Sequence, residues 1–368
     1  MSEPEDAPTP DWWVYRGRQP DEEPRGDGRA TVPAPPDLPA PPPWRAFGLP
    51  RLVREDKEHE LTADDPRRPV PPPPADGRAP SWEDHIAVSY QGDPRARDLV
   101  NAAIHLRRPL LVTGPPGTGK TTLAASIARE LGLGPVLRWG ITSRSTLKEG
   151  LYDYDVLGRL HDVNLQQRIA PDRIPEAAED IGKYLRLGPL GDALLPRRRP
   201  RVLLIDEIDK SDVDLPNDLL HVFETGGYEI PELRRTELSP VRVLPADGGP
   251  RVPVHHGKVR CAQFPVVILT SNGEREFSAA FRRRCLFLRL GHPEGERLRK
   301  IVLTHVPELT DAGQVEDIVV EYERLMTEGR QLSPDQLINA VRLRLSAQLG
   351  PGDLETIREA VLHPLSGA

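Results

Sequence analysis

The stretch GPPGTGKTT, residues 114–122, determines how the rest of the chain is interpreted. It satisfies the pattern G-x-x-x-x-G-K-[ST], in which glycines let backbone N–H groups turn inward around phosphates while the next helix points its positive end at them. A short apolar strand is expected at Leu110–Thr113 before the stretch, and TTLAASIAREL (121–131) continues it with apolar residues at helical spacing. This strand–loop–helix context is the one that the pattern requires. The sequence therefore predicts a loop that binds a nucleoside triphosphate.

The residues of this loop have distinct expected roles. Lys120 is placed to reach the β- and γ-phosphates, and the Thr121 hydroxyl is placed to ligate Mg²⁺, so the expected cofactors are ATP and Mg²⁺. The residues expected to contact the nucleotide are Gly114, Pro115, Pro116, Gly117, Thr118, Gly119, Lys120, Thr121 and Thr122.

Two carboxylates follow an apolar run in VLLIDEID (202–209). The four apolar residues predict a buried strand, and open α/β sheets bind ligands at the carboxyl ends of their strands. We expect Asp206 to hold Mg²⁺ through water and Glu207 to polarise the attacking water as a general base. The alternative is a strand that simply ends in a polar turn, and the phosphate loop upstream makes it the weaker interpretation.

A second buried strand ends in a polar amide in PVVILTSN (265–272). Asn272 is a candidate for orienting the water or touching the γ-phosphate. Taken alone, an asparagine at a strand end is more often a turn residue.

The order of apolar segments predicts the fold class. Five short strands are expected, and they are separated by helical or irregular stretches, which favours a parallel α/β sheet covered on both faces. They are Leu110–Thr113, Pro135–Trp139, Val202–Ile205, Pro265–Thr270 and Cys285–Leu290. The sequence thus divides into a tail (1–81), an α/β nucleotide-binding domain (82–291) and a small helical lid domain (292–368).

Composition restricts the class of protein. Before residue 82 the chain is proline-rich, and we expect a disordered tail because such a segment buries too little apolar surface. The net charge of −7 does not favour a nucleic-acid binder, and two cysteines make no disulfide framework. No signal peptide or membrane-spanning run is evident, so a cytoplasmic protein is expected.

Two aromatic islands interrupt the tail, DWWVYRG (11–17) and the pair Trp44 and Phe47. Trp and Tyr dominate binding hot spots, so Trp12–Tyr15 is a candidate docking motif for a partner. The alternative is that these aromatic residues have no role.

The order of these motifs, followed by an arginine cluster and a helical tail, resembles the AAA+ ATPases. Within them, GPLGDAL and RVLLIDEIDKSDVDLPNDLLHVFETGGYEI are similar to the corresponding run of the MoxR-like branch. The resemblance extends from about Val88 to Leu349 and implies an oligomeric ring, expected to be a hexamer.

The resemblance also implies roles for further residues. Gly92 in SYQGDP matches the glycine of the adenine pocket. The stretch 142–200 is similar to the branch's helix-2 insertion, with Lys148–Asp155 as its pore-facing part, and 227–263 is similar to the hairpin before the first sensor. His255 and His256 in that stretch are a weak metal signal.

The run SAAFRRRC (278–285) is, by itself, most simply a solvated charged face. In AAA+ proteins an arginine at this position reaches a neighbour's γ-phosphate, and the resemblance assigns that role to Arg284, with Arg283 as the alternate and Arg282 solvated.

One part of the family pattern is missing. Asp335 in LSPDQLINA stands where a sensor-2 arginine is expected, and Arg330 or Arg342 are the possible substitutes.

Three functions remain open from the sequence. The first is an ATP-driven, chaperone-like remodeller of a protein client. The second is a nucleotide-gated assembly switch or scaffold with slow hydrolysis. The third, a nucleic-acid-linked NTPase, is the weakest because the chain lacks an N-K-x-D motif and a pronounced basic domain.

Overall fold

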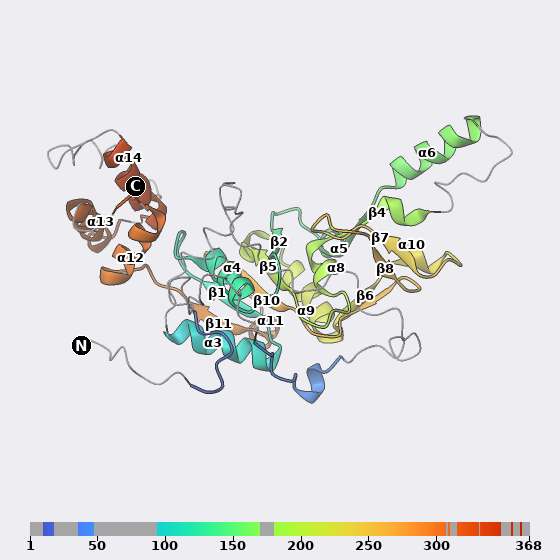
Figure 1. The fold of residues 1–368 in the computed structure, drawn as a ribbon, viewed down its shortest axis with the longest axis horizontal. Coiled ribbons are helices and arrows are strands. Elements are labelled where there is room, and N and C mark those ends of the chain that lie inside the picture. Colours follow the sequence, from blue (N-terminus) through green and yellow to red (C-terminus); the bar gives the residue numbers. More distant parts are fainter. Residues whose placement is uncertain are drawn as a thin grey trace, which may run out of the picture.

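The computed structural model of this 368-residue chain describes residues 10–17, 36–47, 94–169, 180–306, 308–309, 315–330, 332–346, 355 and 361–362. Figure 1 shows a central sheet domain, a group of helices at one end and an extended arm at the other. No helix among these residues has the length and apolar character needed to cross a membrane.

The central domain is built on five parallel strands, as predicted. Their order across the sheet is β11-β1-β10-β5-β2, and the pairing runs Thr113 to Ser271 and Leu269 to Ile205. The strands are β1 (Leu110–Thr113), β2 (Leu137–Gly140), β5 (Val202–Asp206), β10 (Val266–Ser271) and β11 (Leu286–Arg289). Because all five run in one direction, the polar residues that end β1, β5 and β10 lie along the same edge of the sheet.

Alternate residues of these strands face two separate hydrophobic cores. Leu110, Val112 and Leu204 pack on one face, which α3 (Pro94–Leu106) and α4 (Lys120–Glu130) cover. The other face packs against α9 (Leu215–Thr225) and α11 (Ala279–Arg284). The sheet is therefore buried on both sides, which explains why its strands read as continuous apolar runs.

Between β2 and β5 the chain forms the arm and its base. Its elements are α5 (Leu147–Leu151), β3 (Tyr152–Tyr154), α6 (Val156–Ile169), η3 (Ile181–Tyr184), β4 (Leu185–Leu187) and α8 (Pro189–Ala193). Strands β3 and β4 pair antiparallel, and α6 projects away from the body (Figure 1). In the segment Lys148–Asp155, Gly150 lies so close to Trp139 that a Cβ there would stand 2.4 Å from its ring. Gly150, Leu151 and Tyr152 are buried, so only the polar residues of this segment face outward.

The stretch 227–263 forms two antiparallel pairs. Strand β6 (Gly227–Glu229) pairs with β9 (Lys258–Arg260), and β7 (Val241–Val243) pairs with β8 (Val252–Val254). The short helix α10 (Pro231–Arg234) lies between them in sequence. Within the described part of the chain no group of three or more His, Cys, Asp or Glu side chains is arranged to hold a metal, and this includes His255 and His256.

The C-terminal helices have a core of their own. They are α12 (Gly295–His305), α13 (Glu316–Thr327) and α14 (Pro334–Ser346). Leu298, Tyr322 and Leu337, one from each helix, are fully buried together. An ion pair between Asp317 and Arg344 joins α13 to α14 and lowers the pKa of Asp317. We call this group of helices the lid.

Two N-terminal segments also pack on the central domain, and they require a correction. Tyr15 is fully buried within its own chain, so it is not available as a docking motif for a partner, although Trp12 is 44% exposed. The second segment contains the 3-10 turn η2 (Pro43–Arg45), where Trp44 is 75% exposed. The rest of the expected tail lies outside the described residues.

Candidate functional site

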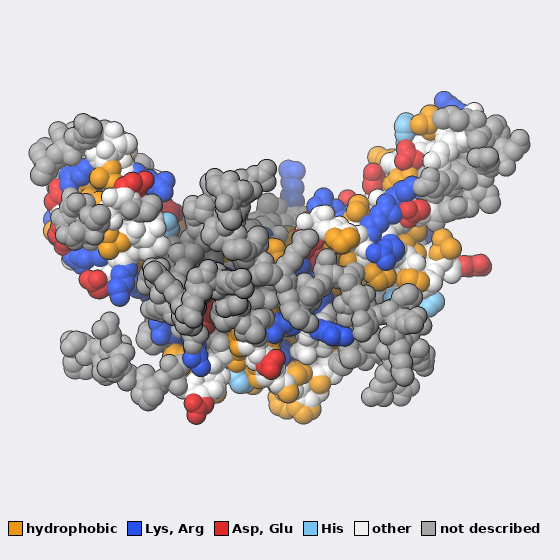
Figure 2. All heavy atoms as spheres, in the orientation of Figure 1, with side chains coloured by type: hydrophobic (Ala, Val, Ile, Leu, Met, Phe, Trp, Pro, Cys, Tyr) orange, Lys and Arg blue, Asp and Glu red, His pale blue; other side chains and the backbone are white. Residues whose placement is uncertain are grey.

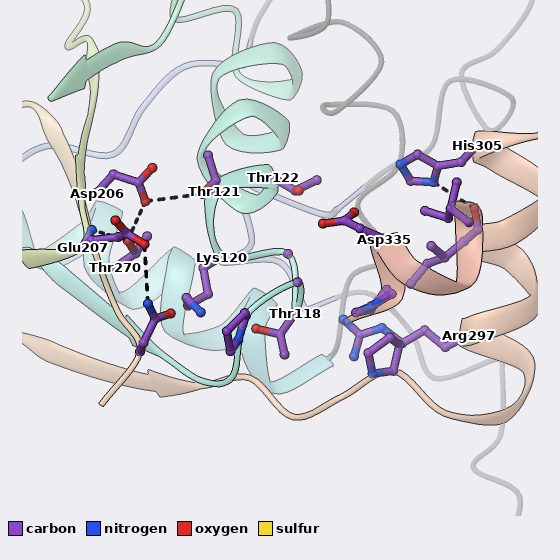
Figure 3. A pocket seen from close by; sticks show the side chains of 18 of the residues that line it. Thr118, Lys120, Thr121, Thr122, Asp206, Glu207, Thr270, Arg297, His305 and Asp335 are labelled. Carbon is purple, nitrogen blue, oxygen red and sulfur yellow. Dashed lines mark hydrogen bonds between the residues drawn. The ribbon is translucent and has the colours of Figure 1, made fainter. Parts of the chain in front are cut away.

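A cavity of about 680 Å³ lies at the carboxyl edge of the sheet, between the central domain and the lid (Figure 3). Four parts of the chain line it: the loop before α4, the ends of β5 and β10, strand β2, and helices of the lid. Its lining includes Pro116, Gly117, Thr118, Gly119, Lys120, Thr121, Thr122, Arg138, Asp206, Glu207, Lys210, Thr270, Asn272, Pro293, Arg297, Ile301, His305, Pro334, Asp335 and Ile338. The cavity therefore brings together three motifs that are distant in the sequence. The pair at 206–207 lies roughly 90 residues after the loop 114–122, and Asn272 lies roughly 150 residues after it.

The loop before α4 depends on its glycines. Gly114 and Gly117 have φ values of +156° and +76°. A Cβ on Gly114 would stand 2.3 Å from the Leu290 carbonyl oxygen, and one on Gly117 would stand 2.6 Å from Pro334 of the lid. Any larger residue would thus push the loop away from β11 or from the lid.

Lys120 is held by this loop. Its Nζ donates hydrogen bonds to the carbonyl oxygens of Gly114 (2.7 Å) and Pro115 (2.8 Å). Burial lowers the pKa of Lys120, and the nearby carboxylates, Asp209 first, act in the opposite direction. Gly114 and Pro115 are not in the cavity lining, and they contribute the carbonyls that hold this ammonium group.

Asp206 is the most densely contacted carboxylate of the cavity. Its Oδ1 accepts hydrogen bonds from Thr270 Oγ1 (2.6 Å) and from Thr121 Oγ1 (3.4 Å), and its Oδ2 forms an ion pair with Arg138 (2.6 Å). Thr270 Oγ1 also accepts the backbone N–H of Glu207 at 2.8 Å. The two expected metal ligands, Asp206 and Thr121, therefore lie side by side.

These oxygens suit Mg²⁺. That ion is usually held by one or two carboxylates, a hydroxyl and substrate phosphates, and it keeps several waters. The Asp206 carboxylate and the Thr121 hydroxyl supply the protein ligands of such a set, next to the loop expected to hold phosphates. Arg138 already places a cation on Asp206, and its side chain is 46% exposed, so it has room to move away.

Glu207 and Asn272 meet across the same edge. Glu207 has left-handed backbone angles (φ 60°, ψ 48°), which are uncommon outside glycine and recur at functional sites. Its carboxylate pairs with Lys210 at 2.8 Å, and this hydrogen bond raises the pKa of Lys210. Asn272 Nδ2 lies 3.5 Å from Glu207 Oε1, while the Asn272 N–H donates to buried Asp209 (2.9 Å).

The predicted arginines lie outside the cavity. The run 278–285 forms α11, whose N-terminus is capped by the side chain of Ser278. Arg284 forms an ion pair with Glu224 of α9, and both side chains are about half exposed. The Arg283 carbonyl accepts a hydrogen bond from Arg108. Gly92 falls outside the described residues.

The lid contributes Arg297 and His305, which sequence reasoning missed, and Asp335, which the sequence analysis placed at the sensor-2 position. Figure 3 shows Arg297, His305 and Asp335 on the lid side, across the cavity from Lys120. Arg297 Nε is buried and has no hydrogen-bond partner among the described residues. Of the substitutes considered for a lid arginine, Arg330 is not in the lining and Arg342 donates to the carbonyl of His305. No local pattern distinguishes Arg297 from Arg299, the other arginine of GERLRK (295–300).

Comparisons with known proteins find one family and several solved structures that are similar to this chain. Residues 110–289 match the model of the family described as ATPase family associated with various cellular activities (AAA). The chain is similar to domain III of the replication initiation protein DnaA from Thermotoga maritima (TM-score 0.40, 15% identity, 76% of this chain and 98% of that chain). It is also similar to a Thermotoga maritima RuvB mutant (0.39, 14%, 73% and 70%) and to a katanin structure that addresses self-assembly (0.34, 18%, 71% and 74%).

At these levels of identity the likeness to solved structures concerns the fold alone. The family match covers the five strands of the sheet, from the first residue of β1 to the last residue of β11. The match to this family therefore spans the whole central sheet.

Proposed function

We propose that this chain binds and hydrolyses ATP and works as a MoxR-like, chaperone-like remodeller of a protein client, in an oligomeric ring. The observation that supports this most directly is the division of the site. The cavity gathers Lys120, Asp206, Glu207 and Asn272, whereas Arg284 stands outside it on an exposed helix end. Arg138 and Arg297 line the cavity, but Arg284, the arginine that the resemblance assigns to the transition state, lies outside it, so a second copy would have to bring Arg284 to the phosphates.

The groups in the cavity have separate tasks in this proposal. Lys120 exchanges its two carbonyl contacts for the β- and γ-phosphates of ATP. Asp206 and Thr121 would hold Mg²⁺, which would offset negative charge on the phosphates.

Glu207 acts on the attacking water. It accepts a proton from that water as its oxygen bonds to the γ-phosphorus and the bond to the β-phosphate oxygen breaks, and the side-chain amide of Asn272 orients the water. Lys210, paired with the same carboxylate at 2.8 Å, holds it in place.

Arg284 is suited to act on a neighbouring copy. Its ion pair with Glu224 is half exposed, and such surface pairs contribute only about 0–1 kcal/mol. A phosphate group from another subunit would therefore compete easily with Glu224 for the guanidinium. Arg283, which lies beside it on α11, is the alternate.

The arm supports the assignment of a protein client. Helix α6 exposes Leu157, Leu160 and Leu165, and Figure 2 shows the arm and the lid as separate projections from opposite ends of the molecule. Large exposed apolar side chains on a projecting helix are typical of a surface that contacts another protein.

The test is the ATPase rate measured against protein concentration. We expect specific activity to rise steeply at an assembly threshold in the wild type and to remain low at all concentrations in Arg284→Ala. Arg282→Ala, on the solvated neighbour, is the matched control and should behave as the wild type. Specific activity that does not change on dilution, together with a normal Arg284→Ala, would show that the ring mechanism is wrong.

The second candidate is a nucleotide-gated assembly switch with slow hydrolysis. The observation that favours it is Asp335, an acidic residue that lines the cavity where the family pattern has an arginine. Glu207→Gln separates the two functions, because a switch needs only binding and assembly. A remodeller loses its output in this variant although the ring still forms with ATP, whereas a switch keeps its output.

A further inference from the structure

The segment Pro10–Gly17 lies against α3 and α4 through specific contacts (dark blue in Figure 1). Trp13 Nε1 donates to Asp98 at 2.9 Å, and the Trp12 carbonyl lies 2.9 Å from His105 Nε2. At the end of the segment the Arg16 N–H donates to Glu130 at 2.6 Å. Backbone and side chains are therefore recognised together, as in sites that bind extended peptides.

Asn101 is central to this recognition. Its Oδ1 accepts the N–H groups of Val14 (2.7 Å) and Tyr15 (2.9 Å), and its Nδ2 donates to the carbonyls of Tyr15 (2.7 Å) and Arg97 (2.9 Å). Asn101 is fully buried, and all four positions at which its amide can form hydrogen bonds are used. The hydrogen bonds of this buried amide are completed by a segment 86 residues away, which indicates that the position of Asn101 is adapted to that segment.

Tyr15 connects the segment to the helix that follows the phosphate loop. Its ring is fully buried in the same core as Leu123 and Ile127 of α4, and its hydroxyl lies 3.0 Å from Ser126 Oγ. Helix α4 begins at Lys120, so Ser126 is less than two turns from the residue expected to bind phosphate. Docking of the segment thus fixes the position of the helix on which ATP binding depends.

The second N-terminal segment extends the contact to the far side of the domain. Arg107 and Arg199 donate to the carbonyls of Pro39 (2.6 Å) and Pro36 (3.0 Å), and Phe47 packs on Phe264 at 5.8 Å between ring centroids. Residues 18–35 separate the two segments in sequence, and an extended chain of that length spans at most about 60 Å. The contacts of the second segment (36–47) keep Pro10–Gly17 close to the surface of α3 and α4, which favours docking within the same chain.

We propose that the groove formed by Asp98, Asn101, His105, Ser126 and Glu130 is a peptide-binding site whose ligand is the chain's own Pro10–Gly17, and that its occupancy controls ATP affinity. The site accepts an extended segment with two tryptophans followed at position +2 by a tyrosine. When the segment leaves, Tyr15 is withdrawn from the core beneath α4, and the phosphate loop loses support. The proposal rests on the nucleotide site described above, but it requires neither a ring nor a client.

The first test uses a fluorescently labelled peptide of residues 9–18 and the full-length chain. In Tyr15→Ala the internal segment is weakened, so we expect the peptide to bind this variant saturably and the wild type at least about tenfold more weakly. Adding Asn101→Asp should abolish binding, because the new oxygen faces the Tyr15 and Arg97 carbonyls. Equal binding to Tyr15→Ala with and without Asn101→Asp, or no binding at all, would overturn the proposed groove.

The second test measures the dissociation constant of a non-hydrolysable ATP analogue, which is independent of catalysis and assembly. We expect several-fold weaker binding in Tyr15→Ala and recovery when the peptide is saturating. Tyr15→Phe, which removes only the hydroxyl near Ser126, should weaken binding less and keeps the test valid if Tyr15→Ala folds poorly. Trp44→Ala is the control from the other segment. If both Tyr15 variants bind the analogue as tightly as the wild type, the contact of Tyr15 with α4 has only a structural role. The proposal that occupancy of the groove controls ATP affinity would then be wrong.

Discussion

In the cavity, Asp206 receives hydrogen bonds from Thr270 and Thr121 and an ion pair from Arg138, whereas at the end of α11 the Arg284 guanidinium pairs with Glu224 and donates to the Ala280 carbonyl at 3.4 Å. The first group is mostly buried and joins two strands to the phosphate loop. The second lies on the surface, and its ion pair is about half exposed. The difference shows that the cavity is organised within one chain, and it is consistent with the proposal that Arg284 changes partners on assembly.

The largest effect expected from this comparison is at Arg284. An arginine that acts on a transferring phosphoryl group contributes about 10³-fold or more to kcat, so Arg284→Ala should lower the rate of the assembled protein by that order. Arg283→Ala tests the alternate, and a larger loss there would transfer the role to it. The measurement is steady-state ATPase above the assembly threshold.

Mixing two inactive variants tests whether Arg284 acts between chains. A 1:1 mixture of Arg284→Ala and Glu207→Gln contains some sites with an intact Glu207 from one chain and an intact Arg284 from the next. If neighbours associate at random, about a quarter of the sites are complete, and activity should return to that order. Absence of any recovery in mixed assemblies would place Arg284 outside the reaction or within its own site.

The next largest effect is at Glu207, on the cavity side of the comparison. Loss of a general base lowers rates by about 10²–10⁴-fold, so Glu207→Gln should lower kcat by that order. The amide keeps the size of the side chain, and ATP affinity should remain close to that of the wild type. Lys210→Ala is the graded control, because it leaves the carboxylate and removes only its partner at 2.8 Å. A Glu207→Gln variant with nearly full kcat would contradict the assignment.

The lid should give a smaller effect, on binding rather than on rate. A hydrogen bond to a charged group contributes about 1.5–3 kcal/mol, so Arg297→Ala should weaken ATP binding by roughly 10–100-fold if Arg297 contacts phosphate. Arg299→Ala is the matched control on the same helix, because Arg299 pairs with Glu316 on α13. The dissociation constants of an ATP analogue for the two variants are measured by calorimetry. Equal losses in both variants would indicate damage to the lid rather than a contact with the nucleotide.

The comparison also shows what could be predicted from sequence. The loop 114–122 and the pair at 206–207 are readable because each function is encoded in one contiguous stretch at a strand end. Asn272 lines the same cavity because parallel strands end at a common edge, and its role stays a prediction. The geometry of Glu207 with Lys210 then follows from a local turn.

Other residues depend on tertiary structure that no local pattern encodes. Arg297 reaches the cavity only because the lid folds back over it, and Arg138 occupies an exposed position of β2 that looks merely solvated. Tyr15 is the clearest case. Its neighbourhood has the composition of a disordered tail, and the amide that binds it lies 86 residues downstream.

The smallest effect concerns the end of α11, the helix that carries Arg284. Cys285, the next residue, is buried, and burial raises the pKa of its thiol to about 12, as it does for Cys261. Almost no thiolate is then present at pH 8, so a thiol reagent should react with neither cysteine in the native protein and with both after denaturation. In Cys261→Ala the reaction reports on Cys285 alone.

The same pKa shifts set a pH dependence of stability. The unfolded thiols ionise near pH 8.5, and the folded ones near 12. Their folded-state pKa is raised, so their contribution to stability is fully present below about pH 8.5 and is lost progressively as the pH rises towards 12. Thermal denaturation of the wild type and of Cys261→Ala between pH 8 and 10 should show a smaller decline in the variant. In the labelling experiment, rapid reaction of Cys285 in the native protein would mean that the C-terminal end of α11 opens readily. Arg284 would then move together with its helix, and not by a change of side-chain rotamer on a rigid helix.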